Sequence, residues 1–266
     1  MKKVSINLIF LLLSVNIINA QVPFSLSNNT IFTPSGKSII TSGENYYINQ
    51  PNRNNHSLNI YIKGSALDFD ELATYGISVN YPISDQFQLY LGCGYFGFDL
   101  MNELNVTSAI SLILDNLCLG MSGQYNRVFI KDFSSEGIFS FDLFGKVFSD
   151  NFSVGFLVNN INQAQYSNYE NTINQRAIFS AGYDISEQFS ADVGTVIIIN
   201  SKSSLLFSAK YRPTEELAIN LKYLANNQRI TFGLAITPIN WIALNFFFTH
   251  QEIFGTDYYL INQIDW

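Results

Sequence analysis

The sequence predicts an all-β protein, a transmembrane antiparallel up-and-down β-barrel of about 14 strands. Three observations lead to this fold class. Hydrophobic residues make up 47% of the chain and charged residues only 13%, whereas soluble domains carry about 25% charged residues. Beyond residue 20 no apolar run is long enough for a membrane helix, and apolar residues alternate with polar ones at a period of two. A large soluble β-sandwich is the alternative, but a closed barrel is the β structure that a bilayer tolerates.

The first residues have the pattern of a secretory signal peptide. A basic start, Met1–Lys3, precedes the apolar run Val4–Ile18, and Ala20 precedes a plausible cleavage point. The apolar run is shorter than the ~20 residues of a membrane-spanning helix. We therefore expect a signal peptide over residues 1–20, and a plug, periplasmic segment or loose tail over residues 21–56. The barrel is expected over residues 57–266.

Alternation defines the expected strands. Residues 75–81 place apolar side chains at odd positions, and residues 217–223 repeat the pattern. Phe144 and Phe247 are exceptions to it. The expected strands lie near residues 57–64, 74–82, 87–99, 105–115, 117–127, 136–148, 152–160, 174–184, 188–200, 204–212, 217–225, 228–237, 241–250 and 258–266.

Short polar turns bracketed by aromatic residues recur along the chain, at 81–87, 147–152, 183–189 and 211–217. Ordinary hairpins of a soluble protein would also have polar turns, but the aromatic bracket favours a periplasmic aromatic belt. Its expected members are Tyr81, Phe87, Phe148, Phe152, Tyr183, Phe189, Tyr211 and Trp241. The opposite connections are then outer loops, at 65–73, 100–104, 128–135, 161–173, 201–203, 226–227 and 251–257.

The final segment resembles the closing strand of a bacterial outer-membrane β-barrel, whose terminal aromatic residue marks the chain for insertion. The residues that carry this resemblance are Tyr258, Leu260, Ile264 and Trp266. It implies the outer membrane as location, with both termini in the periplasm. It also implies that this strand contacts the barrel-assembly machinery.

The alternation of apolar and polar residues predicts that a set of charged side chains points into the barrel. They are Lys63, Asp142, Lys146, Arg176, Asp192, Lys210, Lys222 and Arg229. A network of paired charges in the lumen is favoured over a substrate site. Small inward residues either line a narrow path or make room for a plug or for tight strand coiling. They are Gly76, Ser78, Gly92, Gly94, Gly155, Ser180, Gly182, Thr231 and Gly233.

The remaining residue types exclude several functions. Cys93 and Cys118 fall on opposite faces of their strands, so we expect two free thiols. A net charge of −7 argues against nucleic-acid binding. His250 near Glu252 and Asp257 is a weak basis for an enzyme, and His56 precedes the first strand. Neither cofactor nor metal is expected.

The expected 14 strands, the segment before them and the periplasmic ends together resemble the FadL-like superfamily. Within it, residues 211–217 and the strand 230–234 look like the PorV/PorQ branch. That branch consists of outer-membrane barrels linked to the type IX secretion system of Bacteroidota. The resemblance implies a role in secretion or surface attachment of proteins, with outer-membrane lipid and secretion-system or surface proteins as partners. The alternative it implies is transport of small hydrophobic molecules across the outer membrane.

Overall fold

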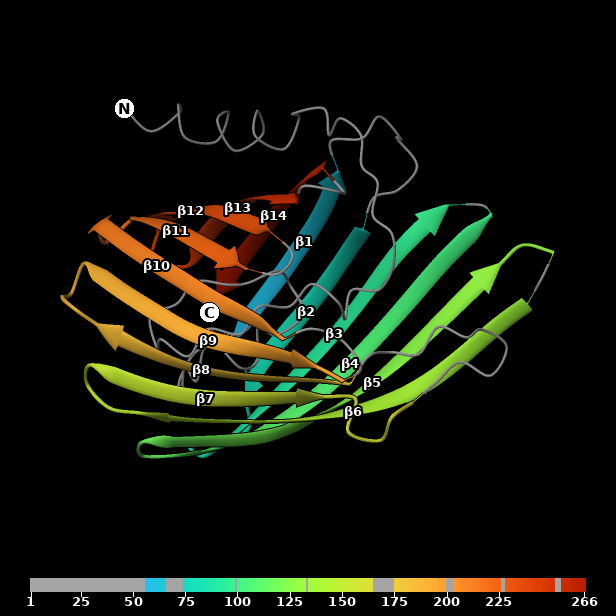
Figure 1. Cartoon of the computed structure of the whole chain (residues 1–266), viewed down its shortest axis with the longest axis horizontal. Helices are drawn as coiled ribbons and strands as arrows, with labels where there is room; N and C mark the ends of the chain where they lie inside the picture. The colour runs from blue at the N-terminus through green and yellow to red at the C-terminus, as the bar shows by residue number, and fades with distance from the viewer. Residues whose placement is uncertain are drawn as a thin grey trace.

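The protein is a closed barrel of antiparallel strands (Figure 1). The computed structural model describes residues 56–65, 74–98, 100–132, 134–164, 175–199, 203–225, 228–251 and 255–266. In these residues 14 strands follow one another around the sheet, and β1 pairs with β14 to close it. The predicted fold class is confirmed. The expected segments 1–20 and 21–56 lie outside the described residues, apart from His56.

The strand bounds agree with the alternation in the sequence. They are β1 Ser57–Ser65, β2 Thr74–Pro82, β3 Phe87–Phe98, β4 Met101–Leu114, β5 Leu117–Ile130, β6 Ser134–Phe148, β7 Phe152–Asn159, β8 Arg176–Asp184, β9 Phe189–Ile198, β10 Ser204–Thr214, β11 Leu217–Leu224, β12 Arg229–Ile239, β13 Ile242–Gln251 and β14 Gly255–Asp265. In the described part of the chain, no helix has the length and apolar character needed to cross a membrane.

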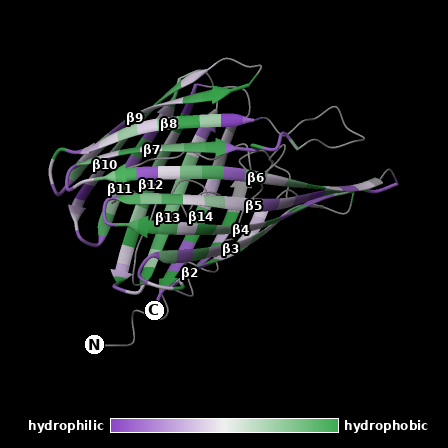
Figure 2. Cartoon of the chain, turned by 90° about the horizontal axis from the view of Figure 1, so that it is seen from below, coloured by the Kyte–Doolittle hydropathy of each residue, from purple (hydrophilic) through white to green (hydrophobic). Residues whose placement is uncertain are grey.

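The outer face of the barrel is apolar. Side chains such as Ile77, Leu91, Phe179 and Phe232 are between 42% and 50% exposed, and their sequence neighbours turn inward. Apolar and polar residues alternate along the strands (Figure 2). A closed sheet pairs its backbone groups internally, so an apolar outer face can sit in hydrocarbon without unpaired N–H or C=O groups. The barrel is a transmembrane one.

Tight turns join the strands at one end of the barrel. Ser84 and Ser186 act alike in the β2–β3 and β8–β9 turns, where each hydroxyl accepts a hydrogen bond from the N–H of the Phe three residues later. Pro213 and Pro238 lie where the strand registers shift, between Tyr211 and Thr214 and between Ile236 and Ile239. Proline has no N–H to donate to a ladder, so these shifts accommodate it next to the turns.

At the other end, β4, β5 and β6 extend together beyond the end of β7 (Figures 1 and 2). Two expected outer loops, 100–104 and 128–135, are wrong in large part, because Met101 pairs with Ile130 and Ile130 pairs with Ser134. Strands β4, β5 and β6 pair with one another beyond the point where β7 ends. The polar residues in these segments therefore belong to paired strands that continue past the end of β7.

The barrel closes at a seam between β1 and β14. All residues from Ser57 to Ser65 have partners in β14. Below them His56 and Trp266 exchange two backbone hydrogen bonds, of 3.3 and 3.1 Å. The His56 ring stacks on the Trp266 ring with centroids 5.8 Å apart and lies 4.7 Å from the Tyr81 ring. These contacts hold the tight-turn end of the seam.

Candidate functional site

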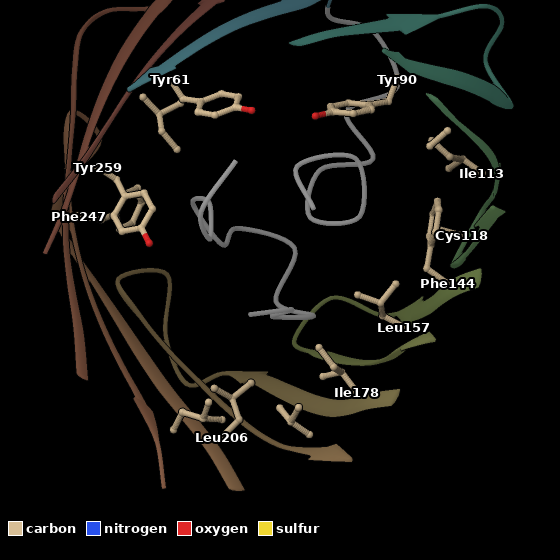
Figure 3. Packing of buried hydrophobic residues seen from close by; sticks show 14 residues of the cluster. Tyr61, Tyr90, Ile113, Cys118, Phe144, Leu157, Ile178, Leu206, Phe247 and Tyr259 are labelled. Carbon is tan, nitrogen blue, oxygen red and sulfur yellow. The ribbon is translucent and has the colours of Figure 1, made fainter. Parts of the chain in front are cut away.

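The inner wall of the barrel carries a ring of buried apolar residues, called here the inner apolar cluster. Its side chains come from strands all around the barrel and project from the wall toward the centre (Figure 3). The cluster consists of Tyr61, Tyr90, Ala109, Ile113, Cys118, Phe144, Leu157, Ile178, Val196, Leu206, Leu224, Phe247, Tyr259 and Ile261. This cluster explains the two exceptions to alternation. Phe144 and Phe247 point inward and belong to it, and they are only 2% and 3% exposed.

Aromatic rings of the cluster lie over glycines of neighbouring strands. Tyr61 pairs with Gly76 across the β1–β2 ladder, and a Cβ on Gly76 would overlap the Tyr61 ring. Phe247 pairs with Gly233, where a Cβ would come within 2.6 Å of the ring. Small residues at these positions therefore make room for rings that lean over them, in keeping with tight packing.

Polar side chains form a second feature of the inner wall, around Asp142 on β6. Its Oδ2 accepts hydrogen bonds from Ser122 Oγ at 3.1 Å and Gln124 Nε2 at 2.5 Å. Its Oδ1 accepts one from the Asn160 N–H at 2.9 Å. Charge-assisted bonds of this kind are the stronger ones, so Asp142 ties β5 to the end of β7. Nearby, the Arg176 guanidinium donates twice to Asn159 Oδ1.

Seven of the eight charged residues expected to point into the lumen are buried. Asp142, Lys146, Asp192, Lys210, Lys222 and Arg229 are each at most 7% exposed. Asp192 Oδ2 accepts a hydrogen bond from Ser208 Oγ at 2.7 Å. Arg176 is buried as well, and the side chain of Lys63 lies outside the described residues.

Seven of the eight expected belt residues are exposed on the outer face near the tight turns. They are Tyr81, Phe87, Phe152, Tyr183, Phe189, Tyr211 and Trp241. The prediction that Phe148 belongs to the belt is wrong. Its side chain packs against the inner apolar cluster, and its ring centre lies 5.8 Å from Lys146 Nζ. It is two residues from Lys146, so alternation places both on the inner face.

The strand expected to carry the insertion signal is β14. Trp266 beyond its end is 61% exposed, and Tyr258 is 41% exposed and lies edge-on to Phe248. Leu260 and Ile264 are half-buried on the same face. The two cysteines are free, with Cys93 exposed and Cys118 buried, which confirms that they lie on opposite faces.

Of the enzyme candidates His250, Glu252 and Asp257, the structure describes the side chain of His250. His250 Nδ1 lies 3.1 Å from the Thr256 hydroxyl, a neutral partner. Glu252 and the Asp257 side chain are outside the described residues. The described part of the chain has no cluster of three or more His, Cys, Asp or Glu that could hold a metal ion.

The chain resembles known proteins at the level of solved structures. No protein-family model matches the chain, and no curated protein matches it significantly. The toluene transporter TbuX of Ralstonia pickettii superposes with a TM-score of 0.52 at 10% identity, over 79% of this chain and 88% of that one. The chain shares with this protein the fold of a closed transmembrane β-barrel.

Two porins superpose with lower scores. The KdgM porin gives a TM-score of 0.46 at 9% identity, over 79% of this chain and 99% of that one. A triple mutant of Rhodopseudomonas blastica porin gives 0.45 at 7% identity, over 80% and 99% of the two chains.

Ser122, Gln124, Asn159 and Asn160 were not singled out by the sequence reasoning. The first three alternate in step with inward residues, so the period of two could have found them. Asn160 has a φ of 52°, a left-handed conformation that asparagine tolerates better than most residues. No local pattern in the sequence indicated that the chain would turn there.

Proposed function

We propose that this barrel resides in the bacterial outer membrane and moves small hydrophobic or amphiphilic molecules through its lumen, without an enzymatic role. The observation that carries the proposal is the inner apolar cluster, which lines the wall of a transmembrane barrel with Leu, Ile, Phe and Tyr side chains. Sites for apolar ligands are lined in this way, with a few polar groups to fix orientation. The fold of TbuX, a toluene transporter, is compatible with the same use.

Both termini are proposed to lie in the periplasm, with the tight turns facing the same side. The support is the asymmetry between short turns at one end and the extended β5–β6 hairpin at the other, since such barrels have short periplasmic turns. Partners in this proposal are outer-membrane lipid and the barrel-assembly machinery, which would bind β14 through Tyr258, Leu260, Ile264 and Trp266.

Flux through the lumen can be measured with purified protein in liposomes, using toluene as the solute. Leu206 and Leu205 form a matched pair, because Leu206 is fully buried in the inner apolar cluster and Leu205 is 53% exposed on the outer face. Leu206→Asn is expected to lower flux about tenfold, because it places an amide in the apolar lining. Leu205→Asn leaves flux near that of the unchanged protein.

Equal flux into empty liposomes and liposomes with the barrel would contradict the transport proposal. Circular dichroism and heat-dependent gel mobility of both variants establish that each is folded before flux is compared.

A second candidate is the secretion-associated role implied by the PorV/PorQ resemblance. The observation that favours it is the hairpin of β5 and β6, which extends together with β4 beyond the end of β7 (Figure 1). Residues of β6 before Leu143 have no ladder partners in β7. Such a projecting sheet offers backbone groups and side chains to a protein partner.

This candidate is tested by pulling down the tagged protein from solubilised outer membrane, with and without residues 128–136. Secretion-machinery or surface proteins that are captured only with the hairpin intact would support it. Unchanged surface attachment of secreted proteins after deletion of the gene would count against it.

A further inference from the structure

The outer face of the β5–β6 hairpin changes from apolar to charged part-way along β5. Every second residue of this strand faces outward, beginning with Leu119 and Met121, which are 41% and 48% exposed. Gly123 and Tyr125 continue the outward row, and Arg127 is its first charged member and is exposed. A charged side chain is costly in hydrocarbon, so Arg127 marks the place where the apolar outer band ends on this strand.

The position of Arg127 along β5 agrees with that boundary. Arg127 lies ten residues beyond Leu117, where β5 begins at the tight-turn end. At ~3.3 Å per residue and a tilt of ~40°, these residues rise ~25 Å along the membrane normal, and the apolar band of such barrels is also ~25 Å tall with aromatic residues at its borders. Tyr125 and Tyr95, each eight residues after the first residue of its strand, are outward aromatic residues at this level. The Arg127 side chain is therefore at the height of lipid headgroups.

Contacts between β5 and β6 hold this arginine in a defined group, called here the Arg127 cluster, which consists of Tyr125, Arg127, Ser135, Gly137 and Phe139. Arg127 Nε donates a hydrogen bond to Ser135 Oγ at 2.7 Å. Gly137 is the ladder partner of Arg127, and a Cβ on Gly137 would overlap the Tyr125 hydroxyl. The Tyr125 and Phe139 rings have centroids 4.7 Å apart, and Phe139 is 63% exposed. The cluster thus places two rings on the apolar side of one cation.

The guanidinium has donors left for an external acceptor. Arginine carries five N–H donors, and Ser135 takes one of those of Arg127. Two carboxylates of neighbouring residues lie on the other face of the sheet. Glu103 and Glu136 are both ladder partners of Val128, which is 8% exposed and adjacent to Arg127 in sequence. Because adjacent residues of a strand point to opposite faces, these carboxylates lie across the barrel wall from the guanidinium.

We infer that the Arg127 cluster binds a phosphorylated membrane lipid, whose phosphate accepts hydrogen bonds from the guanidinium while its acyl chains pack on the Tyr125 and Phe139 rings. A guanidinium matches a phosphate group in geometry, and charge-assisted hydrogen bonds between them are comparatively strong. The lipid is favoured over free phosphate because the cluster combines the cation with rings that border the apolar band. The site requires a barrel that spans a membrane, and it requires neither transport through the lumen nor a protein partner.

The test titrates dimyristoylphosphatidic acid into the full-length protein in a non-ionic detergent, and native mass spectrometry measures the fraction of protein with lipid bound. Dimyristoylglycerol is the matched lipid, because it has the same acyl chains without the phosphate. We expect the phosphorylated lipid to bind about tenfold more tightly, and Arg127→Gln to remove this preference, because the substitution removes the charge-assisted hydrogen bonds. Arg127→Lys should restore only part of the preference, because an ammonium group lacks the planar fork of arginine.

Arg212→Gln is the matched control, because Arg212 lies on β10 at the tight-turn end and the substitution removes the same charge. It should leave the affinity for both lipids unchanged. Equal binding of the two lipids to the unchanged protein, or equal weakening by Arg127→Gln and Arg212→Gln, would overturn the site. Inorganic phosphate that displaces the lipid at an equal concentration would overturn the lipid as its occupant. Toluene flux through the Leu206 and Leu205 variants is measured independently, so this inference and the transport proposal fail separately.

Discussion

At the scale of single residues, the inner wall is organised by rings that lie over cross-strand glycines. Tyr61 over Gly76 and Phe247 over Gly233 are direct ladder pairs, and Phe144 over Gly120 is a third. Glycine weakens a strand through its conformational freedom. The ring recovers part of that loss, because it covers the bare backbone and buries its own apolar surface.

Adding a single methyl group at Gly76 tests this pairing. Gly76→Ala places a Cβ inside the Tyr61 ring position, so the ring must move and the free energy of unfolding should fall by about 1–3 kcal/mol. Gly123→Ala is the control, because its Cβ would meet Phe141 at an ordinary 3.4 Å and should change stability by less than about 0.5 kcal/mol. Urea unfolding of the refolded barrel, followed by tryptophan fluorescence, measures both. Equal losses in the two variants would show that the ring contact at Gly76 is unimportant.

At the scale of elements, the residues that follow β7 hydrogen-bond to the part of β6 that β7 does not reach. Asn162 lies beside β6, where its amide nitrogen donates to the Phe139 carbonyl and its amide oxygen accepts from the Phe141 N–H. The Ile161 N–H also donates to the Phe141 carbonyl. The edge of β6 is therefore partly covered by an asparagine side chain where β7 has ended, which reduces the number of unpaired edge groups.

Removing that side chain should open the edge locally. Asn162→Ala deprives the Phe141 N–H of its acceptor, so amide hydrogen exchange at Phe141 should accelerate about tenfold, which corresponds to about 1.4 kcal/mol of lost protection. Asn151→Ala, in the exposed turn between β6 and β7, is expected to leave this amide unchanged. Exchange measured by mass spectrometry or NMR distinguishes the two. Unaltered exchange at Phe141 in the Asn162 variant would contradict the bridging role.

Elements also show how far the sequence can predict this barrel. Alternation located all 14 strands, because lipid outside and a packed wall inside demand a period of two. It did not predict that β4, β5 and β6 continue beyond the rim, because strands outside the membrane need no apolar outer face. The misassigned Phe148 shows that an aromatic residue near a turn does not by itself indicate a belt. The hydrogen bonds around Asp142 depend on long-range contacts that a single sequence does not display.

At the scale of the whole molecule, each face of the sheet has its own environment. Cys93 is exposed among outer apolar residues such as Leu91, and Cys118 is 3% exposed inside the inner apolar cluster. The two thiols therefore lie on opposite sides of the barrel wall. They form natural probes of the environment on each side.

Thiol labelling of the protein in liposomes should therefore separate the cysteines. A hydrocarbon-soluble maleimide is expected to modify Cys93 and a membrane-impermeant charged one to leave it unmodified, because the thiol faces lipid tails. Cys118 should resist both reagents in the folded barrel and react after unfolding. Cys93→Ser and Cys118→Ser assign each signal by mass spectrometry. Rapid reaction of Cys93 with the charged reagent would place water, not lipid, against the outer face.

The unequal lengths of the strands have a consequence for the surrounding bilayer. Strands β7 and β11 have 8 residues each, whereas β6 has 15. At ~3.3 Å per residue and a tilt of ~40°, an eight-residue strand spans only ~20 Å along the membrane normal, less than a typical hydrocarbon core of ~30 Å. Lipid tails beside the short strands must shorten, tilt or disorder to match them. The barrel should thus create a thinned annulus on one flank, and it should favour membranes built from shorter acyl chains.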